Sequence, residues 1–261
     1  YYGDEGGSPG SVMTYFPFPM AGRGNPGVGE VGRTSYSVPK EAMGAWTERL
    51  ALLDVEGLDH DTRFGEDRIL FKGPDGDAFA LVGTEGDRRA PWTGNGISAD
   101  MAIRGFHGAD MRLRDEGASA ELLTFMGYEE VDRQDNVTRF AVPNGNEANV
   151  IDIETLPGAA HAGQGAGSVH HIAFAVNNRA RQLEVREALM DTGYQVNPVI
   201  DRDYFYAIYF RTPGGVLFEV ATNEPGFATD EDTAHLGEAL QLPSQHAHLR
   251  DKLERVLEPL E

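Results

Sequence analysis

Apolar residues recur along the chain with two different spacings. Short stretches with apolar residues at alternate positions precede longer stretches in which apolar residues recur every three or four positions. A clear example is VHHIAFAV at 169–176, which precedes RARQLEVREALMDTG at 179–193. The first spacing is typical of a β-strand and the second of an amphipathic α-helix. This part of the chain therefore predicts a strand followed by a helix.

The same order occurs twice earlier in the chain. GFHGADMRL at 105–113 precedes EGASAELLTFMG at 116–127, and GRTSYSVP at 32–39 precedes KEAMGAWTERLALL at 40–53. Each copy then closes with strand-like runs around a Gly-containing turn, such as YFYAIYF and VLFEVAT on either side of TPGG. The sequence therefore predicts three copies of a strand–helix–strand–strand–strand module, spaced about 60 to 70 residues apart.

A fragment of a fourth copy is expected at the start of the sequence. SPGSVMTYF at 8–16 has the pattern of the end of a closing hairpin. His171 precedes Pro213 by 42 residues, so aligning Pro9 with Pro213 places the missing opening strand roughly 33 residues before Tyr1. We therefore expect the first module to lack its opening strand and helix in this sequence.

Three further segments have distinct composition. The stretches 83–100 and 157–168 are rich in Gly and polar or small residues, which is typical of linkers. From about Pro243 the tail predicts an amphipathic helix. Its apolar stripe would be formed by Leu249, Leu253, Val256, Leu257 and Leu260.

The charge balance restricts the class of partner. The chain carries 42 Asp and Glu against 22 Lys and Arg, of which three are Lys, and its net charge is −20. Such a surface repels nucleic acid and anionic membranes, and no apolar run approaches the roughly 20 residues of a membrane span. The scarcity of Lys favours a halophilic protein in a high-salt cytoplasm, where screening relieves self-repulsion.

Cysteine is absent from the chain. Disulfides, thiolate metal sites and a Cys nucleophile are therefore excluded. A metal would have to bind His, Asp or Glu, and these ligands favour Fe(II), Mn(II), Zn(II) or Ni(II).

Two strand-like runs carry candidate metal ligands. His170 and His171 open one of them, and adjacent side chains on a strand point to opposite faces, so at most one is expected to face a given pocket. Glu219, between Phe218 and Val220, is costly to bury without a partner, and a metal would supply one. One His and one carboxylate form two thirds of a facial triad. Alternatively, the histidine is structural and the glutamate points to solvent.

The preceding module carries a weaker version of this pattern. His107 occupies the equivalent strand, and Asp152 follows 45 residues later, against 48 between His171 and Glu219. A degenerate second site is one interpretation, and a remnant of duplication is the other.

A family resemblance covers essentially the whole chain. GSVHHIAF, DRDYFYAIYFRTPGGVLFEVATNEPGF at 201–227 and LGEALQLPSQ at 236–245 resemble the hydroquinone branch of the ring-cleaving dioxygenases in the vicinal oxygen chelate superfamily. YYGDEGGSPGSVMTYFPFP at 1–19 resembles the same family, and the block IYFR-x-P-G-G-x-LFE-x-AT is its most specific part. The resemblance implies an α+β fold of βαβββ modules in two domains, with curved sheets that enclose a metal. The implied division is 1–96, 97–228 and a tail at 229–261.

The resemblance also implies roles for individual residues. His171 and Glu219 match two metal ligands, and the third is a histidine in a His-His-x-Thr motif that we expect before Tyr1. His170 matches a histidine beside the metal that acts as acid or base. Tyr209 and Arg202 match a tyrosine and an arginine near the metal, which would hold a substrate oxygen or stabilise negative charge.

The sequence therefore predicts an Fe(II)-dependent, extradiol-type ring-cleaving dioxygenase that degrades a hydroquinone or catechol-like aromatic with O2. Mn(II), Zn(II) and Ni(II) are alternative metals, and a homo-oligomer is one possible assembly. A metal-dependent glyoxalase-type lyase or isomerase, or a thiol transferase, would have the same fold. A third alternative is a protein of this fold that binds an aromatic compound without catalysis.

Overall fold

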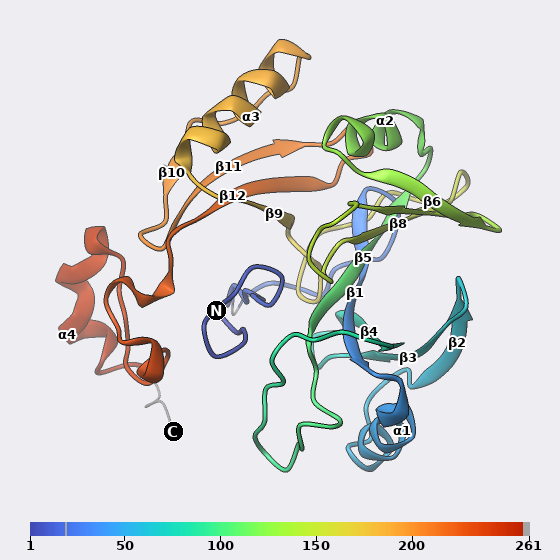
Figure 1. Cartoon of the computed structure of the whole chain (residues 1–261). Helices are drawn as coiled ribbons and strands as arrows, with labels where there is room; N and C mark the ends of the chain where they lie inside the picture. Colours follow the sequence, from blue (N-terminus) through green and yellow to red (C-terminus); the bar gives the residue numbers. More distant parts are fainter. Residues whose placement is uncertain (19, 258–261) are drawn as a thin grey trace. The chain divides into compact units, whose positions relative to one another are not determined.

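The computed structural model describes residues 1–18 and 20–257 (Figure 1). Contacts between residues divide the chain into two compact units. Unit 1 consists of Tyr1–Asp4, Gly10–Ile172 and Arg211–Phe218. Unit 2 consists of Glu5–Pro9, Ala173–Phe210 and Glu219–Glu261.

Unit 1 contains the first two complete modules, in the order that the apolar spacing predicts. The first comprises β1 (Glu30–Pro39), η1 (Lys40–Ala42), α1 (Met43–Leu52), β2 (Asp59–Arg63), β3 (Glu66–Lys72) and β4 (Ala78–Thr84). The second comprises β5 (Gly105–Leu113), α2 (Gly117–Phe125), β6 (Glu129–Gln134), β7 (Val137–Ala141) and β8 (Val150–Thr155).

The two modules of unit 1 share one curved, eight-stranded sheet (Figure 1). The strand order is β2-β3-β4-β1-β5-β8-β7-β6, so each module contributes four adjacent strands. The opening strands β1 and β5 pair in antiparallel fashion at the centre and join the two halves. Within each half the opening strand runs parallel to the closing strand, β1 to β4 and β5 to β8.

An apolar cluster holds the first helix against this sheet. Trp46 and Leu50 of α1 belong to the same buried cluster as Val38, Ile69 and Leu81 of the strands. The indole Nε1 of Trp46 donates a hydrogen bond to the carbonyl oxygen of Met101 at 2.6 Å. The buried indole N–H is therefore satisfied, as this side chain requires.

Unit 2 is built on the third module. It comprises β9 (Ile172–Val176), α3 (Arg179–Asp191), β10 (Ile200–Asp201), β11 (Phe205–Arg211) and β12 (Leu217–Pro225), apart from a few strand-end residues assigned to unit 1. These strands form a four-stranded sheet in the order β10-β11-β12-β9. The side chain of Asn178 caps α3 by accepting a hydrogen bond from Arg181 N at 3.0 Å.

Glycines follow the ends of two of the helices. Gly127 follows α2 with a φ of 96°, and Gly193 follows α3 with a φ of 95°. Left-handed backbone of this kind is strained for residues with a Cβ, so glycine is favoured after the last helical turn. The α+β fold of repeated βαβββ modules is confirmed.

The N-terminal segment partly matches the predicted hairpin end. Among the described residues before Glu30 there is no helix or regular strand. Tyr2 and Met13 form an isolated antiparallel bridge, with N–O distances of 2.8 and 2.6 Å. The predicted linker 157–168 is held along its length, because Asn25 bonds to Gly163 through the backbone and other residues of 22–28 pair beside it.

The tail differs from the single amphipathic helix that was predicted. It contains short 3₁₀ turns, η2 (Phe227–Thr229), η3 (Thr233–His235) and η4 (Ser244–Leu249), and the four-residue helix α4 (Arg250–Leu253). Val256 and Leu257 lie beyond this helix and are exposed, and Leu260 lies outside the described residues. Helices this short have too few hydrogen bonds to offset the cost of nucleation, so a longer helix needs a packed apolar face.

The compact units group residues by contact rather than by order along the chain. The predicted boundary at 96/97 lies within unit 1, and the boundary at 228/229 lies within unit 2. The division into 1–96, 97–228 and 229–261 stays a prediction. None of the described helices combines the length and the apolar character that crossing a bilayer requires.

Candidate active site

Glu219 is a buried carboxylate at the third position of β12. Its exposed fraction is 3%, and those of Phe218 and Val220 are 0% and 2%. Side chains alternate along a strand, so these two apolar neighbours lie on the face opposite Glu219. The alternative in which this glutamate points to solvent is therefore excluded.

Tyr209 lies beside Glu219 on the neighbouring strand β11, and the two side chains are hydrogen-bonded. Burial of the phenol and the charge of Glu219 raise the pKa of Tyr209 to about 12. The phenol is therefore neutral near pH 7 and can donate its proton in a hydrogen bond.

Arg202 extends this pair to a chain of three side chains. It lies in the turn between β10 and β11, where its backbone N–H donates to the carbonyl oxygen of Phe205 at 2.9 Å. Its Nη2 donates to the hydroxyl oxygen of Tyr209 at 3.4 Å, and its Cζ lies 5.7 Å from the centre of the Tyr209 ring. Arg202, Tyr209 and Glu219, which sequence reasoning predicts as site residues, are thus brought together within unit 2.

Helix α3 supports the two strands that carry this chain. The side-chain Nε2 of Gln182, which is fully buried, donates to the carbonyl oxygens of Tyr206 and Val220 at 2.7 Å each. It therefore joins β11 to β12 directly beside Glu219. Sequence reasoning missed Gln182, although it lies seven residues before the buried Leu189 and so on the same helical face. A polar residue on that apolar face was the available signal.

Asn197 holds the backbone of Tyr209 from the other side. Its Oδ1 accepts a hydrogen bond from Tyr209 N at 2.5 Å, and its own N donates to the carbonyl oxygen of Tyr209 at 3.2 Å. Arg186 of α3 donates in turn to the carbonyl oxygen of Asn197 at 2.9 Å. The position of the Tyr209 side chain is thus set by contacts on both backbone groups.

The two histidines form a contact that the sequence did not predict. Their Nδ1 atoms are 2.8 Å apart and their rings are nearly perpendicular, with centroids separated by 5.1 Å. The expectation that His170 and His171 point to opposite faces is wrong, because both residues precede β9 and the alternation of a strand does not apply to them. In such a contact one Nδ1 donates and the other accepts.

An aromatic side chain lies next to this pair. The ring centroid of Phe16 is 5.6 Å from that of His170 and 6.2 Å from that of His171. All three residues belong to unit 1. The histidine pair therefore contacts an aromatic ring, which is itself half exposed.

The structure groups the five predicted site residues into two sets. His170 and His171 belong to unit 1, whereas Arg202, Tyr209 and Glu219 belong to unit 2. No group of three or more potential metal-ligating side chains occurs among residues 1–18 and 20–257. An imidazole and a buried carboxylate are nonetheless suitable donors for Fe(II) or a similar divalent metal. The donor types of His171 and Glu219 therefore fit a metal.

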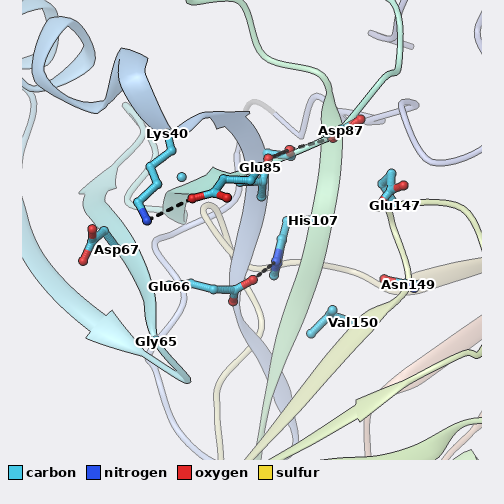
Figure 2. Close-up of a pocket in the computed structure, with 13 residues that line it drawn as sticks. Lys40, Gly65, Glu66, Asp67, Glu85, Asp87, His107, Glu147, Asn149 and Val150 are labelled. Carbon is cyan, nitrogen blue, oxygen red and sulfur yellow. Dashed lines mark hydrogen bonds and ion pairs between the residues drawn. The ribbon is translucent and has the colours of Figure 1, made fainter.

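Unit 1 also contains a polar cavity of about 370 Å³, shown in Figure 2. Hydrogen bonds and ion pairs connect its walls: Lys40 Nζ lies 3.2 Å from Glu85 Oε1, and His107 Nε2 lies 2.9 Å from Glu66 Oε1. None of the five predicted site residues lines this cavity. The lining residues are Ser37, Lys40, Gly65, Glu66, Asp67, Gly83, Thr84, Glu85, Asp87, His107, Glu147, Asn149 and Val150.

Comparison with known proteins identifies the family. The sequence model of the Glyoxalase/Bleomycin resistance protein/Dioxygenase superfamily matches residues 110–220. "Putative ring-cleaving dioxygenase MhqO" of Bacillus subtilis (strain 168) is 41% identical over 262 residues, covering 100% of this chain and 83% of that protein. The chain therefore belongs to this superfamily, and the resemblance inferred from its sequence is confirmed.

Within the superfamily, the curated relatives are ring-cleaving enzymes by name. "Chlorohydroquinone/hydroquinone 1,2-dioxygenase" of Sphingobium indicum is 32% identical over 266 residues, covering 98% of this chain and 82% of that protein. This chain is an enzyme of the ring-cleaving dioxygenase group that these relatives represent.

Solved structures agree with the fold. The crystal structure of a "putative dioxygenase" from Bacillus subtilis superposes with a TM-score of 0.93 at 41% identity, covering 99% of this chain and 83% of that chain. Glyoxalase I from Zea mays superposes with a TM-score of 0.55 at 13% identity, covering 75% of this chain and 68% of that chain. The second similarity shows a shared fold alone.

Proposed function

We propose that the protein is an Fe(II)-dependent dioxygenase that uses O2 to cleave the ring of a hydroquinone or a catechol-like aromatic. The observation that carries the proposal is the chain of contacts from Arg202 through Tyr209 to the buried Glu219. The names of two relatives, a ring-cleaving dioxygenase and a chlorohydroquinone/hydroquinone dioxygenase, support the choice of reaction and substrate.

His171 and Glu219 would hold the metal together with a further histidine. The metal would supply a binding position for the substrate oxygen and for O2, and a path for electrons from the ring to O2. Since the Nδ1 of His171 faces His170, the Nε2 of His171 is the nitrogen suited to coordination.

Tyr209 and Arg202 would act on the charge of the substrate. Burial and the charge of Glu219 raise the pKa of the Tyr209 phenol to about 12, so the phenol keeps its single proton. That proton is donated to Glu219, and it would be available to a substrate oxygen once Glu219 binds a metal. The positive guanidinium of Arg202 lies near the phenol oxygen of Tyr209. It would stabilise negative charge that develops on a substrate oxygen bound at this position. The backbone of Tyr209 is held by Asn197, and Arg202 already contacts its hydroxyl without substrate, which favours effective electrostatic stabilisation.

His170 would move the proton of the substrate hydroxyl. An imidazole has an unperturbed pKa near neutrality, so it can accept a proton and return it during the reaction. Its Nδ1 contact with His171 at 2.8 Å would hold the ring beside the proposed metal ligand, with Phe16 against both rings.

The test is O2 uptake by the purified protein, loaded with Fe(II) under anaerobic conditions and then given hydroquinones and catechols. We expect uptake matched by loss of the aromatic absorbance, and loss of both uptake and bound metal in His171→Ala and Glu219→Gln. His235→Ala is the matched control, because His235 lies at the surface and pairs with Glu238. Absence of uptake with every such ring contradicts the proposal.

Other outcomes of the same assay would identify the alternatives. Turnover without O2 on Zn(II), Ni(II) or Mn(II) would indicate a glyoxalase-type lyase, an isomerase or a thiol transferase. Tight binding of an aromatic compound that neither a chelator nor the two substitutions weaken would indicate a binding protein.

A further inference from the structure

A row of charged side chains crosses the eight-stranded sheet of unit 1. In the strand register Arg33 of β1 is opposite Asp110 of β5, Asp110 is opposite Asp152 of β8, and Asp152 is opposite Arg139 of β7. Directly opposite residues project from the same face of a sheet, so these four side chains share one face. Asp110, Asp152 and Arg139 are exposed by 6%, 2% and 8%.

Arg139 connects two carboxylates of this buried region. Its Nε and Nη2 donate to the two carboxylate oxygens of Asp152 at 2.8 and 3.0 Å. Its Nη1 donates to Glu66 Oε2, and the other oxygen of Glu66 is 2.9 Å from the Nε2 of His107. One guanidinium thus stands between Asp152 and a glutamate that holds a histidine.

These groups correspond by position to the proposed metal ligands. Asp152 is the third residue of β8 and Glu219 is the third residue of β12, and a threonine follows each of them three residues later. His107 precedes Asp152 by 45 residues, and His171 precedes Glu219 by 48. Asp152 and Glu219 therefore occupy equivalent places in successive modules, whereas His107 is the third residue of β5 and His171 directly precedes β9.

We propose that unit 1 contains a degenerate second copy of the cation site, in which the guanidinium of Arg139 is the resident cation. The correspondence between the copies rests on the proposed function, whereas the role of Arg139 stands on its contacts within unit 1. The site takes a guanidinium-type cation, because a planar fork of N–H groups satisfies both oxygens of Asp152 and still reaches Glu66.

Arg63 does not replace Arg139 in this role. Its Nη1 lies 2.8 Å from Asp110 Oδ2 and 3.4 Å from Asp152 Oδ2, and Arg63 forms no ion pair with Glu66 among the described residues, although the two are opposite in the register of β2 and β3. Of the ion pairs among the described residues, those of Arg139 alone bridge Asp152 and Glu66. Removal of Arg139 would therefore take a shared cation from the buried carboxylate of Asp152 and the partly buried carboxylate of Glu66, which is costly.

A small cation could reach the site from solvent. Glu66 and His107 line the cavity of about 370 Å³, and Figure 2 shows their contact at its wall. If the Arg139 side chain were shortened, a soluble guanidinium ion entering through this cavity would find the same carboxylates.

The test is chemical rescue of Arg139→Ala in the full-length protein, followed by thermal unfolding. We expect a lower unfolding temperature than in the wild type, and recovery of at least half of the loss in low millimolar guanidinium chloride but not in sodium chloride of equal ionic strength. Wild type and Arg133→Ala, which removes an exposed arginine of β6, should gain nothing specific from guanidinium. Equal responses to both salts in Arg139→Ala would overturn the proposal.

A second comparison covers a variant that does not fold. If Arg139→Ala folds in guanidinium chloride but not in sodium chloride, the proposal is supported. If it folds in neither salt, Arg139→Lys, which keeps a cation, is compared with Arg139→Met, which keeps most of the length. A higher unfolding temperature for the lysine variant supports the proposal, and equal temperatures overturn it. Unfolding needs neither Fe(II) nor substrate, so failure here is distinguishable from failure of the proposed activity.

Discussion

The hydroxyl of Tyr209 is hydrogen-bonded to the buried carboxylate of Glu219 on the neighbouring strand. This relationship makes the protonation of a phenol depend on a carboxylate that we propose as a metal ligand. Its consequences can be measured without turnover, through the titration of one tyrosine and the stability of the strands that carry the pair.

Substitution of Tyr209 should change how the stability and the tyrosinate absorbance of the protein depend on alkaline pH. The folded-state pKa of about 12 exceeds the ordinary value of 10.0, so the folded protein keeps this proton in a range where the unfolded chain has lost it. Stability therefore falls as pH rises from about 10 to about 12. We expect Tyr209→Phe to make this fall shallower and to remove one component near pH 12 from the tyrosinate absorbance.

The control for this titration is Tyr206→Phe, three residues earlier on the same strand. Tyr206 stacks against Arg179, with the Arg179 Cζ 4.6 Å from its ring centre. This variant should retain the component assigned to Tyr209. If the absorbance of Tyr209→Phe near pH 12 matches that of the wild type, the coupling to Glu219 is wrong.

Substitution of Arg202 should affect both catalysis and the Tyr209 phenol. Arg202→Gln removes the cation beside the phenol oxygen, and a lost stabilising donor costs about 10² in kcat. The hydrogen bond and charge of Arg202 also hold the pKa of Tyr209 down, so the variant should raise that pKa further. Steady-state kinetics and the same absorbance titration measure the two effects.

Arg211→Gln is the matched variant for Arg202, because Arg211 is exposed at the end of β11 and bonds to the carbonyl oxygen of Gly215 at 2.8 Å. It should leave kcat and the titration unchanged. Loss of activity in Arg202→Gln without any change in the Tyr209 titration would contradict the contact between the two side chains.

Gln182→Leu should destabilise the protein. The substitution leaves the buried carbonyls of Tyr206 and Val220 without their side-chain donor, at a cost of about 1–3 kcal/mol in the free energy of unfolding. Urea unfolding measures it. Glu184→Gln, which breaks an exposed ion pair with Arg181 on the same helix, should cost less than about 1 kcal/mol. Equal losses would argue against a role for Gln182 in joining the strands.

Salt should stabilise the protein. At a net charge of −20 the folded state repels itself, and screening shortens the range of that repulsion. We expect the unfolding temperature to rise steadily with potassium chloride. Full stability and activity at low salt would contradict the predicted halophilic character and weaken the case for a high-salt cytoplasm. Sedimentation in the same buffers would test the predicted homo-oligomer.

The order of elements was predictable because each signal is local. Helix α3 was expected at 179–193 and spans Arg179–Asp191, since its apolar spacing and the following Gly193 define it without distant contacts. The central pairing of β1 with β5 was not predictable. Both strands mix polar and apolar residues, so no pattern in either strand identifies its partner.

Site residues were predictable where the apolar residues next to them in the sequence indicate that they are buried. Phe218 and Val220 indicated a buried Glu219, and the structure agrees. The contact between His170 and His171 depends on where β9 begins, and strand ends are poorly defined by pattern. The spacing of Asp152 from His107 marked it as a candidate ligand, whereas no pattern in the sequence marked Arg139, and both are buried in the assembled sheet.

The eight-stranded sheet has a consequence for synthesis of the protein. All of its strands come from one unbroken stretch, Glu30 to Thr155, so every pairing in it can form before the rest of the chain leaves the ribosome. Strands β11 and β12 emerge later. In order of translation, the side chains that we propose for catalysis are therefore added to a chain in which every strand of the larger sheet has already been synthesised.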